Sequence, residues 1–360
     1  MDEKTTQLLD VYKAAVETDI AAYTAHVKKT TREHFGEHPA AVTDAFFDML
    51  ERGGKRMRGA LVIAGYEMCG GTDREMIARA ATAIEMLHAH LLIIDDVQDR
   101  SAVRRGKPTV HEMLKSYYAE GQSEAAAAHN GMSLALNAAW AGGHAAYRII
   151  AGLNVDATLR SNAMGIIADA IVTTAHGQTQ DYMQEVTGQA TESDIDHVME
   201  WKTAYYSVLN PLCVGMVLAG AGCEDTDAIR DYALHGGKAF QITDDLIGVF
   251  GSNAQTGKDV MDDIREGKQT LLTAYALQHT TATEKAFLRS CLGSPLLSHE
   301  DFKRCQEIIT ASGARNFAET AAEAHIVEGL ASLDKAPKHW KPEQVAFLRA
   351  LARSFSGRTQ

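Results

Sequence analysis

The apolar residues of this chain fall into long runs. Polar segments typical of helix N-termini interrupt these runs. Thr72-Asp73-Arg74-Glu75 and Thr191-Glu192-Ser193-Asp194 each place a capping residue before acidic first-turn residues. The pattern predicts helices at 4–34, 40–52, 58–69, 73–99, 129–150, 155–187, 192–221, 226–249, 268–279, 298–312 and 313–333. The clearest predicted loops are 100–108 and 250–267.

Composition supports a helical protein. The chain has only six prolines among 360 residues, much alanine and few β-branched runs, and 46% of its residues are hydrophobic. No Pro/Gly/Ser-rich linker divides it. We therefore predict an all-α fold: one helical-bundle domain over residues 1–360, with its motif-bearing core at about 50–280.

Charge and cysteine usage narrow the function classes. The net charge of −12 argues against nucleic acid as a partner and requires local cations for any anionic substrate. The five cysteines show neither disulfide nor zinc spacing. The acidic start, Met1-Asp2-Glu3, is unlike a signal peptide, and the longest weakly polar stretch, 212–222, is too short to span a bilayer. These features predict a cytoplasmic protein without a transmembrane segment.

A first aspartate cluster ends the predicted helix 73–99. Asp95, Asp96 and Asp99 follow an apolar run, and His88 and Leu92 share one helical face with Asp95 and Asp99. The helix dipole disfavours anions at this end, so three retained carboxylates indicate cation binding. A solvated acidic helix end is the simpler alternative.

A second cluster strengthens the interpretation. Asp244 and Asp245 lie in another apolar run, with Gln241 and Gly248 on the face of Asp244. Mg²⁺ takes one or two carboxylates and completes its shell with phosphate oxygens and water. Two such clusters facing each other across a cavity would hold a diphosphate bridged by magnesium.

Basic residues accompany both clusters. Arg104 and Arg105 follow the first, and Lys258 and Lys268 follow the second in a glycine-containing segment, where lysine can close over a phosphate. A third basic set, Gly53-Gly54-Lys55-Arg56-Met57-Arg58, begins a helix and forms a candidate anion site. Read singly, Lys258 and Lys268 are more typical of solvated surface lysines, and the third set is equally consistent with a basic helix start that binds no ligand.

Together these motifs resemble the trans-isoprenyl diphosphate synthases, the family that includes farnesyl and geranylgeranyl diphosphate synthases. The matching segments, in chain order, are Gly53–Arg58, Asp95–Asp99 with Arg104-Arg105-Gly106, Gly177-Gln178-Thr179-Gln180-Asp181, Lys202-Thr203, Gln241–Asp245, Lys258 and Lys268. The resemblance implies an all-α isoprenoid synthase fold around a deep central cavity, a homodimer, and about three Mg²⁺ ions at the two aspartate motifs. Residues before 50 and after about 280 carry no matched motif.

The resemblance also implies residue roles. Isopentenyl diphosphate would bind at Lys55, Arg58, His88 and Arg105. The allylic diphosphate would bind at Arg104, Lys202, Thr203, Gln241, Lys258 and Lys268. Magnesium would bind at Asp95, Asp99 and Asp244, and catalysis would depend on these residues with Asp96, Asp245 and Lys202.

Three positions depart from the family pattern. Gly59 stands where proline is usual, Ile94 stands where histidine often precedes the first aspartate, and Gly248 ends the second motif. A second motif ending in glycine does occur in geranylgeranyl-type members, so metal binding remains the expectation.

The expected reaction joins isopentenyl diphosphate to an allylic diphosphate by ionisation, condensation and proton loss. Leu87, His90 and Leu91 precede Asp95 by eight, five and four positions, so they are the predicted floor of the product tunnel. Leu91 and His90 are smaller than the aromatic pairs of farnesyl-type members, which favours geranylgeranyl diphosphate, with farnesyl diphosphate as the alternative. His90 has a second interpretation, as a core histidine facing another helix.

Two other classes remain as alternatives. A type I terpene cyclase would carry an Asn/Ser/Glu metal triad where this chain has Asp244-Asp245, and it would not need Lys55 and Arg58. A non-catalytic partner subunit of a heteromeric synthase usually loses aspartates from one motif, and both are present here. Both comparisons favour the synthase.

Overall fold

The computed structural model describes residues 3–252 and 259–356, and almost all of their regular structure is helical. Helices make up 80% of the chain, which confirms the all-α fold class. Within the described residues, the only strands are β1 (Val103–Arg104) and β2 (Lys107–Pro108), which pair as an antiparallel hairpin. The chain divides into two compact units.

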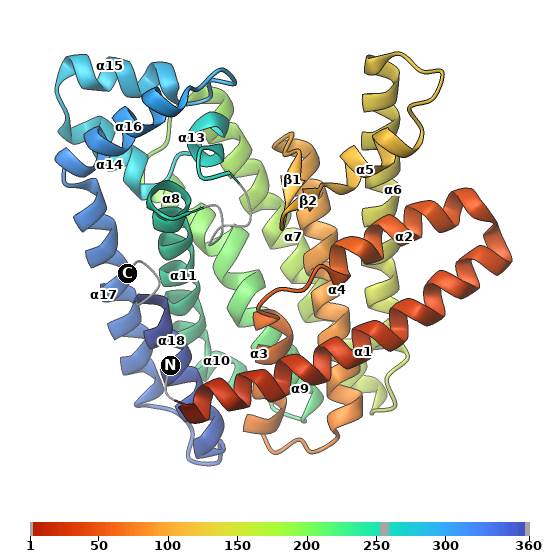
Figure 1. Cartoon of the computed structure of the whole chain (residues 1–360). Helices are drawn as coiled ribbons and strands as arrows, with labels where there is room; N and C mark the ends of the chain where they lie inside the picture. The colour runs from red at the N-terminus through yellow and green to blue at the C-terminus, as the bar shows by residue number, and fades with distance from the viewer. Residues whose placement is uncertain (1–2, 253–258, 357–360) are drawn as a thin grey trace. The chain divides into compact units, whose positions relative to one another are not determined.

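The N-terminal unit consists of Thr6–Gly165 and Pro211–Gly220. Besides the hairpin it holds α1 (Glu3–Phe35), α2 (Glu37–Glu51), α3 (Met57–Met68), α4 (Arg74–Gln98), α5 (Val110–Tyr117), α6 (Glu124–Ala151), the start of α7 (Ala157–Thr187) and most of α9 (Asn210–Leu218). Figure 1 shows α1 and α2 as a long helical hairpin within this unit.

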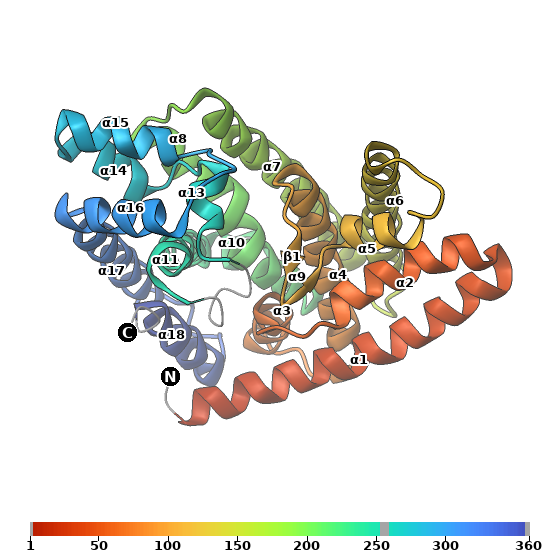
Figure 2. The same cartoon turned by 45° about the horizontal axis from the view of Figure 1, so that its top comes forward.

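The C-terminal unit consists of the described residues of Met1–Thr5, Ile166–Asn210 and Ala221–Gln360. It holds the rest of α7, then α8 (Glu192–Val198), the π-helix η1 (Met199–Leu209), α10 (Cys223–Ala228), α11 (Arg230–Phe250), α13 (Asp262–Glu266), α14 (Leu271–His279), α15 (Ala282–Cys291), α16 (His299–Ala311), α17 (Ala314–Leu333) and α18 (Pro342–Ser356). Figure 2 shows α14, α15 and α16 grouped near one end of α17.

Helix α4 is the central helix of the N-terminal unit. Asp73 caps it by accepting a 3.0 Å hydrogen bond from the Met76 amide, so the helix begins at Arg74, one residue later than predicted. It packs against α2, α3, α5 and α6. By length and composition α4 alone, among the described helices, could cross a membrane, but 67% of its apolar window is buried inside the protein, as in a core helix.

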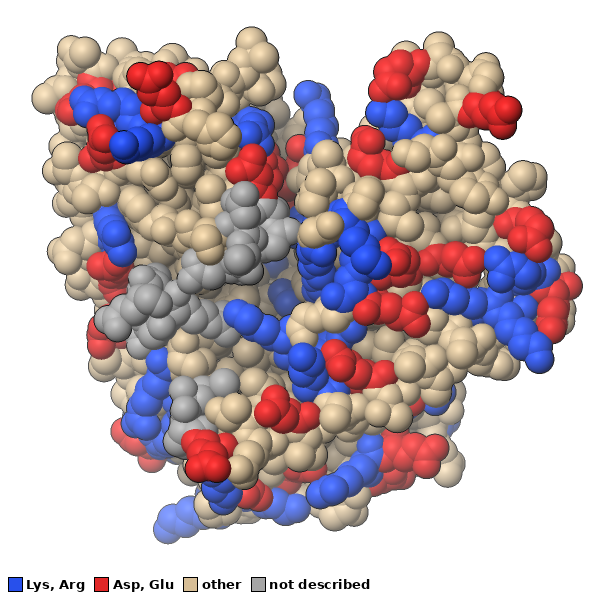
Figure 3. All heavy atoms as spheres, in the orientation of Figure 1, with Lys and Arg blue, Asp and Glu red and all other residues tan. Residues whose placement is uncertain are grey.

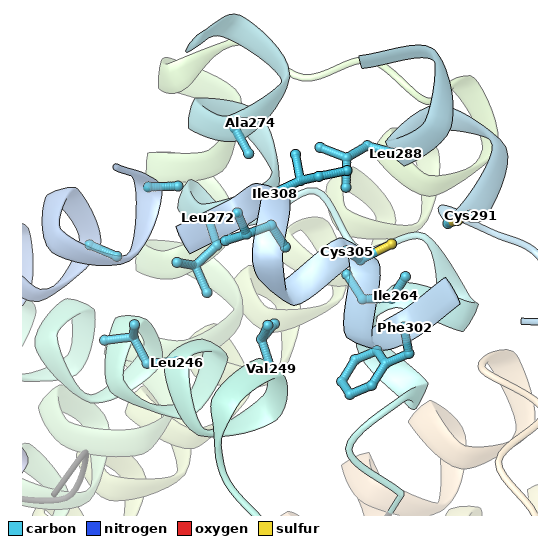
Figure 4. Packing of buried hydrophobic residues seen from close by; sticks show 14 of the residues in the cluster. Leu246, Val249, Ile264, Leu272, Ala274, Leu288, Cys291, Phe302, Cys305 and Ile308 are labelled. Carbon is cyan, nitrogen blue, oxygen red and sulfur yellow. The ribbon is translucent and has the colours of Figure 1, made fainter. Parts of the chain in front are cut away.

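Helix α11 is the corresponding central helix of the C-terminal unit. It packs along η1 and α17, with α13, α14 and α18 beside it. Its apolar residues Leu246 and Val249 join a buried cluster with Ile264 and Leu272 (Figure 4). The last turns of α11, which hold the second aspartate motif, are therefore anchored by apolar packing.

Several predicted elements need correction. The predicted helix 192–221 is three elements, α8, η1 and α9, because the middle stretch winds as a π-helix. The predicted loop 100–108 contains the β1–β2 hairpin. The predicted loop 250–267 contains α13, and its residues 253–258 lie outside the described residues. Helices α5, α10, α15 and α18 were not predicted.

Candidate active site

The first aspartate motif closes α4 in the N-terminal unit. The Asp96 side chain is fully buried, while Asp95 and Asp99 are partly exposed. Arg104 Nε donates a 2.5 Å hydrogen bond to Asp96 Oδ1, and its Nη2 lies 3.1 Å from Asp95 Oδ2. Burial raises the pKa of Asp96 to about 6, although Arg104 opposes the shift. The motif thus has one inward carboxylate and two that are accessible.

The β1–β2 hairpin carries Arg104 and Arg105 beside this motif. Arg52, which is almost fully buried, holds the hairpin by donating to the backbone carbonyls of Arg104 at 3.0 Å and Pro108 at 2.6 Å. Arg105 has a left-handed φ of +54°, and its Nη1 donates to the Gly53 carbonyl. Sequence reasoning missed Arg52, because nothing local marks a side chain that bonds the backbone more than 50 residues away.

The predicted isopentenyl diphosphate residues form a cationic cluster at the start of α3. Lys55 is exposed, and Arg58 Nη1 lies 3.3 Å from His88 Nε2. Burial and then the neighbouring arginines, Arg58 first, hold the pKa of His88 well below its usual range. His88 is therefore neutral and accepts the hydrogen bond from Arg58.

The same crowding acts on Arg105. Burial lowers the pKa of its guanidinium, and the charge of Arg56 adds to the effect. Figure 3 shows Lys and Arg side chains gathered over the hairpin and the segment between α2 and α3. Cations crowded so closely at a helix N-terminus form an anion site.

Arg56 was not among the predicted site residues, yet it organises this cluster. It has a left-handed φ of +47°, and its buried side chain donates a 2.7 Å hydrogen bond to the Leu50 carbonyl. Its guanidinium also lies 3.4 Å from Glu85 of α4, and Glu85 accepts a 2.9 Å hydrogen bond from the Gly59 amide. The Arg56–Glu85 pair thereby fixes the segment that carries Lys55 and Arg58.

The second aspartate motif lies near the end of α11 in the C-terminal unit. Asp244 is exposed, while Asp245 is buried and its Oδ1 accepts a 2.7 Å hydrogen bond from the side-chain Nε2 of Gln241. Thr203 of η1 donates a 2.7 Å hydrogen bond to Gln241 Oε1. Burial, followed by the charge of Asp263, raises the pKa of Asp245 well above its usual range. Two consecutive hydrogen bonds thus link Thr203 to Gln241 and Gln241 to Asp245.

Lys202 lies in the π-helix, an element often found at functional sites. Its Nζ is 2.5 Å from Asp181 Oδ2 of α7. A Cβ added to Gly177 would lie 2.4 Å from the Lys202 backbone nitrogen, so only glycine lets α7 and η1 approach this closely. Asp181 falls in the matched segment 177–181, but its pairing with Lys202 was not predicted.

Of the two remaining predicted cations, Lys258 and Lys268, the structure describes only Lys268. Lys268 Nζ lies 3.3 Å from Glu266 and 3.9 Å from Asp263. Lys258 lies outside the described residues. No group of three or more His, Cys, Asp and Glu side chains is gathered into a metal-ligand set within 3–252 and 259–356.

The predicted chain-length residues all lie on α4. Leu87 is buried, and Leu91 is partly exposed. His90 Nδ1 lies 2.7 Å from the Ala139 carbonyl of α6, and a Cβ added to Gly143 would come within 2.9 Å of the same nitrogen. His90 thus faces a neighbouring helix, the second interpretation given by the sequence, and its effect on product length stays a prediction.

A family-level comparison agrees with these features. The family model for polyprenyl synthetases matches residues 39–309, a range that includes every motif described above. The chain belongs to the polyprenyl synthetase family.

Individual relatives agree with this membership. The chain is 33% identical over 305 residues to a geranylfarnesyl diphosphate synthase of Aeropyrum pernix, covering 83% of this chain and 89% of that protein. It is 32% identical over 270 residues to a geranylgeranyl diphosphate synthase of Saccharolobus solfataricus, covering 74% of this chain and 75% of that protein.

A solved structure shares the fold over almost the whole length. This is a geranylgeranyl pyrophosphate synthase from Corynebacterium glutamicum, complexed with isoprenyl diphosphate and magnesium, with a TM-score of 0.89 and 29% identity over 99% of this chain and 100% of that chain. The protein is therefore a prenyltransferase, a short-chain trans-isoprenyl diphosphate synthase.

Proposed function

We propose that the enzyme condenses isopentenyl diphosphate with an allylic diphosphate and that its main product is geranylgeranyl diphosphate. The observation that carries this proposal is the cationic cluster of Lys55, Arg58 and Arg105 beside neutral His88. A diphosphate site built from three cations and a neutral histidine, without an aspartate, suits a second substrate whose own C–O bond does not break. A terpene cyclase has no use for such a site, since it takes one diphosphate substrate.

The allylic diphosphate is the substrate assigned to the aspartate motifs. Magnesium, when bound with it, neutralises the diphosphate leaving group as the allylic C–O bond breaks. In the N-terminal unit, Asp95 and Asp99 are the accessible carboxylates that fit magnesium, because Asp96 is held in a buried hydrogen bond. In the C-terminal unit, Asp244 is the accessible carboxylate, because Asp245 is held in a buried hydrogen bond. About three ions are proposed, each completing its shell with phosphate oxygens and water.

The chain's own cations and amides complete the allylic site. Lys202, Lys258, Lys268 and Arg104 would bind diphosphate oxygens, and the hydrogen-bonded pair Thr203–Gln241 would orient the group. The double bond of isopentenyl diphosphate then attacks the allylic carbon, a C–C bond forms, and a proton passes to the released diphosphate. Apolar surroundings must exclude water, which would otherwise trap the cation as an alcohol.

Product length is assigned from α4. Leu91 and His90 leave more room than paired aromatic side chains would, and Leu87 lies one further turn from Asp95. Relatives named as geranylfarnesyl and geranylgeranyl diphosphate synthases support a product longer than farnesyl diphosphate, which remains the alternative.

A cytoplasmic homodimer is the proposed working form. An apolar stripe on α6 supports it: Met132, Leu136 and Trp140 recur at every fourth residue, and their exposed fractions are 38%, 48% and 66%. A large exposed apolar patch is typical of a protein interface. Sedimentation of the wild type and of Trp140→Glu tests this assignment, since a dimer joined through α6 dissociates in the variant.

The decisive experiment incubates the purified enzyme and Mg²⁺ with labelled isopentenyl diphosphate and each allylic diphosphate in turn, and resolves products by chain length. Geranylgeranyl diphosphate is the expected main product. A hydrocarbon formed without isopentenyl diphosphate would indicate a cyclase. Turnover that occurs only after a partner subunit is added would indicate a non-catalytic subunit of a heteromeric synthase.

A further inference from the structure

Arg52 follows the last residue of α2, and its side chain joins both strands of the β1–β2 hairpin. This side chain is 1% exposed and donates to a carbonyl on each strand, at 3.0 Å to Arg104 of β1 and at 2.6 Å to Pro108 of β2. Its Nε also donates a 2.8 Å hydrogen bond to Asp48 Oδ2, and Asp48 Oδ1 accepts a 3.2 Å hydrogen bond from Lys107 Nζ. Burial opposes the charge of Asp48, but Arg52 and Lys107 outweigh it and lower the pKa of this carboxyl. The anchor is therefore an ion pair as well as a set of backbone hydrogen bonds.

The hairpin needs such an anchor. Its strands have two residues each, and a two-stranded hairpin is at best marginally stable on its own. Its turn residues, Arg105 and Gly106, have φ values of +54° and +72°, which is typical of a type I′ turn but costly for arginine. Arg105 Nη1 in turn donates to the carbonyl of Gly53, the residue after Arg52. The contact is thus reciprocal: Arg52 binds the hairpin backbone, and Arg105 binds the backbone beside Arg52.

Two adjacent residues of the hairpin serve different parts of the candidate site. Arg104 binds Asp95 and Asp96 of the first aspartate motif. Arg105 lies among the cations assigned to isopentenyl diphosphate, where the charge of Arg58 is one of those that lower its pKa. Because one peptide bond joins the two arginines, a shift of the hairpin backbone displaces both guanidinium groups.

We infer that Arg52 is a positioning residue for both substrates: through the hairpin backbone it fixes Arg104 for the allylic diphosphate and Arg105 for isopentenyl diphosphate. The inference rests on the proposed function, because the two arginines belong to the sites assigned there. Arg52 acts indirectly, since its three nitrogens already donate to Asp48 and to the hairpin carbonyls. A side chain that only stabilised the fold would not change the KM values of both substrates together.

The test uses steady-state kinetics of the full chain, with each substrate varied separately, and thermal unfolding in parallel. Arg52→Lys keeps a positive charge beside Asp48 but loses the planar fork that spans the two carbonyls. Asp48→Asn weakens the anchor from its other end, and it decides the question if Arg52→Lys does not fold. Arg79→Lys is the matched control, because the same substitution there disturbs a pair with both oxygens of Asp19 of α1, at 2.8 and 2.9 Å.

The expected result is a KM raised by about three- to tenfold for both substrates in Arg52→Lys, by a smaller factor in Asp48→Asn and for neither substrate in Arg79→Lys. In an Arg105→Ala background, Arg52→Lys is expected to add little to the KM for isopentenyl diphosphate and still to raise that for the allylic diphosphate. The reason is that a positioning effect disappears once its target side chain is gone.

Failure of this role and failure of the proposed function give different results. A wild type that elongates no allylic diphosphate overturns the proposed function itself. An active wild type whose KM values are unchanged in Arg52→Lys and Asp48→Asn overturns only the role of Arg52. A raised KM for one substrate alone, or an equal rise in Arg79→Lys, also overturns that role. A full further rise of the KM for isopentenyl diphosphate in the Arg105→Ala background overturns the route through Arg105.

Discussion

Arg104 Nε donates a 2.5 Å hydrogen bond to Asp96, the fully buried member of the first aspartate motif. The same guanidinium reaches Asp95 at 3.1 Å, and the attraction of both carboxylates outweighs burial and raises the pKa of Arg104. Asp96 is thus committed to holding the hairpin arginine, whereas Asp95 and Asp99 stay accessible. Asp96 therefore has a structural task, and the proposed metal-binding task falls to Asp95 and Asp99.

Replacing the accessible aspartates tests the metal assignment. Asp95→Ala and Asp99→Ala are expected to abolish Mg²⁺-supported turnover and leave the melting temperature nearly unchanged, because the metals act on charge that develops in the transition state. Asp96→Ala is expected to lower stability as well, by about 3 kcal/mol, since it removes a partner of a buried arginine. Turnover and thermal unfolding are measured together, with exposed Asp169→Ala as the control. Near-normal turnover in Asp95→Ala would remove its proposed role.

The two substrate sites predict opposite kinetic effects. Lys55→Ala and Arg58→Ala are expected to raise the KM for isopentenyl diphosphate by tenfold or more, since a charge-assisted contact is worth about 1.5–3 kcal/mol. Lys202→Ala and Lys268→Ala are expected to raise the KM for the allylic diphosphate or to lower kcat. Steady-state kinetics, with each substrate varied separately, measure kcat and both KM values. Equal effects on both substrates from all four variants contradict the assignment.

Local sequence predicted most of the fold because its signals are local. Apolar runs and capping residues mark the helices, and Thr191 caps α8 as expected. The π-helix η1 was missed because no local sequence signal distinguishes its winding from that of an α-helix; it lies where Gly177 of α7 approaches Lys202. The hairpin was missed because its two-residue strands are held by Arg52 from another helix.

The residues of the candidate site were predicted better than their partners. Lys55, Arg58, Lys202 and Lys268 stand in recognisable segments. Long-range pairings carry no local signal: Glu85 with Arg56 is separated by 29 residues, and Asp181 with Lys202 by 21. Asp263 was visible in the sequence, but nothing there shows that it fills the space beside Gly248. Such partners become visible only once the helices are packed.

The Arg56–Glu85 pair gives a prediction that separates stability from substrate binding. Glu85→Gln leaves buried Arg56 with the half-exposed Glu17, 3.7 Å from its Nε, and removes the full charge that caps Gly59, so it is expected to cost about 3 kcal/mol of unfolding free energy. The double variant Arg56→Met with Glu85→Leu is expected to regain most of this stability, because apolar replacement of a buried pair is often neutral.

The KM values then show whether the Arg56–Glu85 pair also supports the proposed isopentenyl diphosphate site. The double variant is expected to keep a raised KM for isopentenyl diphosphate with a near-normal KM for the allylic substrate, because Lys55 and Arg58 lose their fixed backbone. Denaturant unfolding and two-substrate kinetics are the measurements. A double variant with wild-type KM values would show that the pair is merely structural.

A histidine pair in the C-terminal unit predicts acid sensitivity. His235 Nδ1 lies 2.9 Å from His325 Nδ1, a contact that needs one ring to accept. Burial first, and then the charges of His235 and Lys238, lower the pKa of His325 below its ordinary 6.5, while Asp196 and Glu328 oppose the shift. The unfolded chain therefore takes up a proton at a higher pH than the folded protein.

Stability is accordingly expected to be fully present above pH 6.5 and to fall as the pH drops toward the folded pKa, by at most about 1.4 kcal/mol per pH unit for this one proton. His325→Gln is expected to flatten the profile in this range. Urea unfolding at a series of pH values measures the slope, and His279→Gln, at the exposed last residue of α14, is the control. An unchanged slope in His325→Gln excludes the pair as its source.

Product length is tested on α4. A growing chain that runs from Asp95 toward the start of the helix meets Leu91, His90 and Leu87 at roughly 6, 7.5 and 12 Å along the axis. His90 is held toward α6 by its 2.7 Å contact with the Ala139 carbonyl, so Leu91 is the proposed first barrier. Leu91→Ala is expected to shift the main product one isoprene unit longer, and the addition of Leu87→Ala to extend it further.

His90→Ala alone is expected to change product length little and to lower stability by about 1 kcal/mol, the value of the lost hydrogen bond. Combined with Leu91→Ala it is expected to lengthen the product beyond either single change, because two side chains of the proposed tunnel floor are then shortened together. Products are resolved by chain length, with Leu296→Ala at a highly exposed position as the control. If none of these variants lengthens the product, the floor of the tunnel lies on another helix.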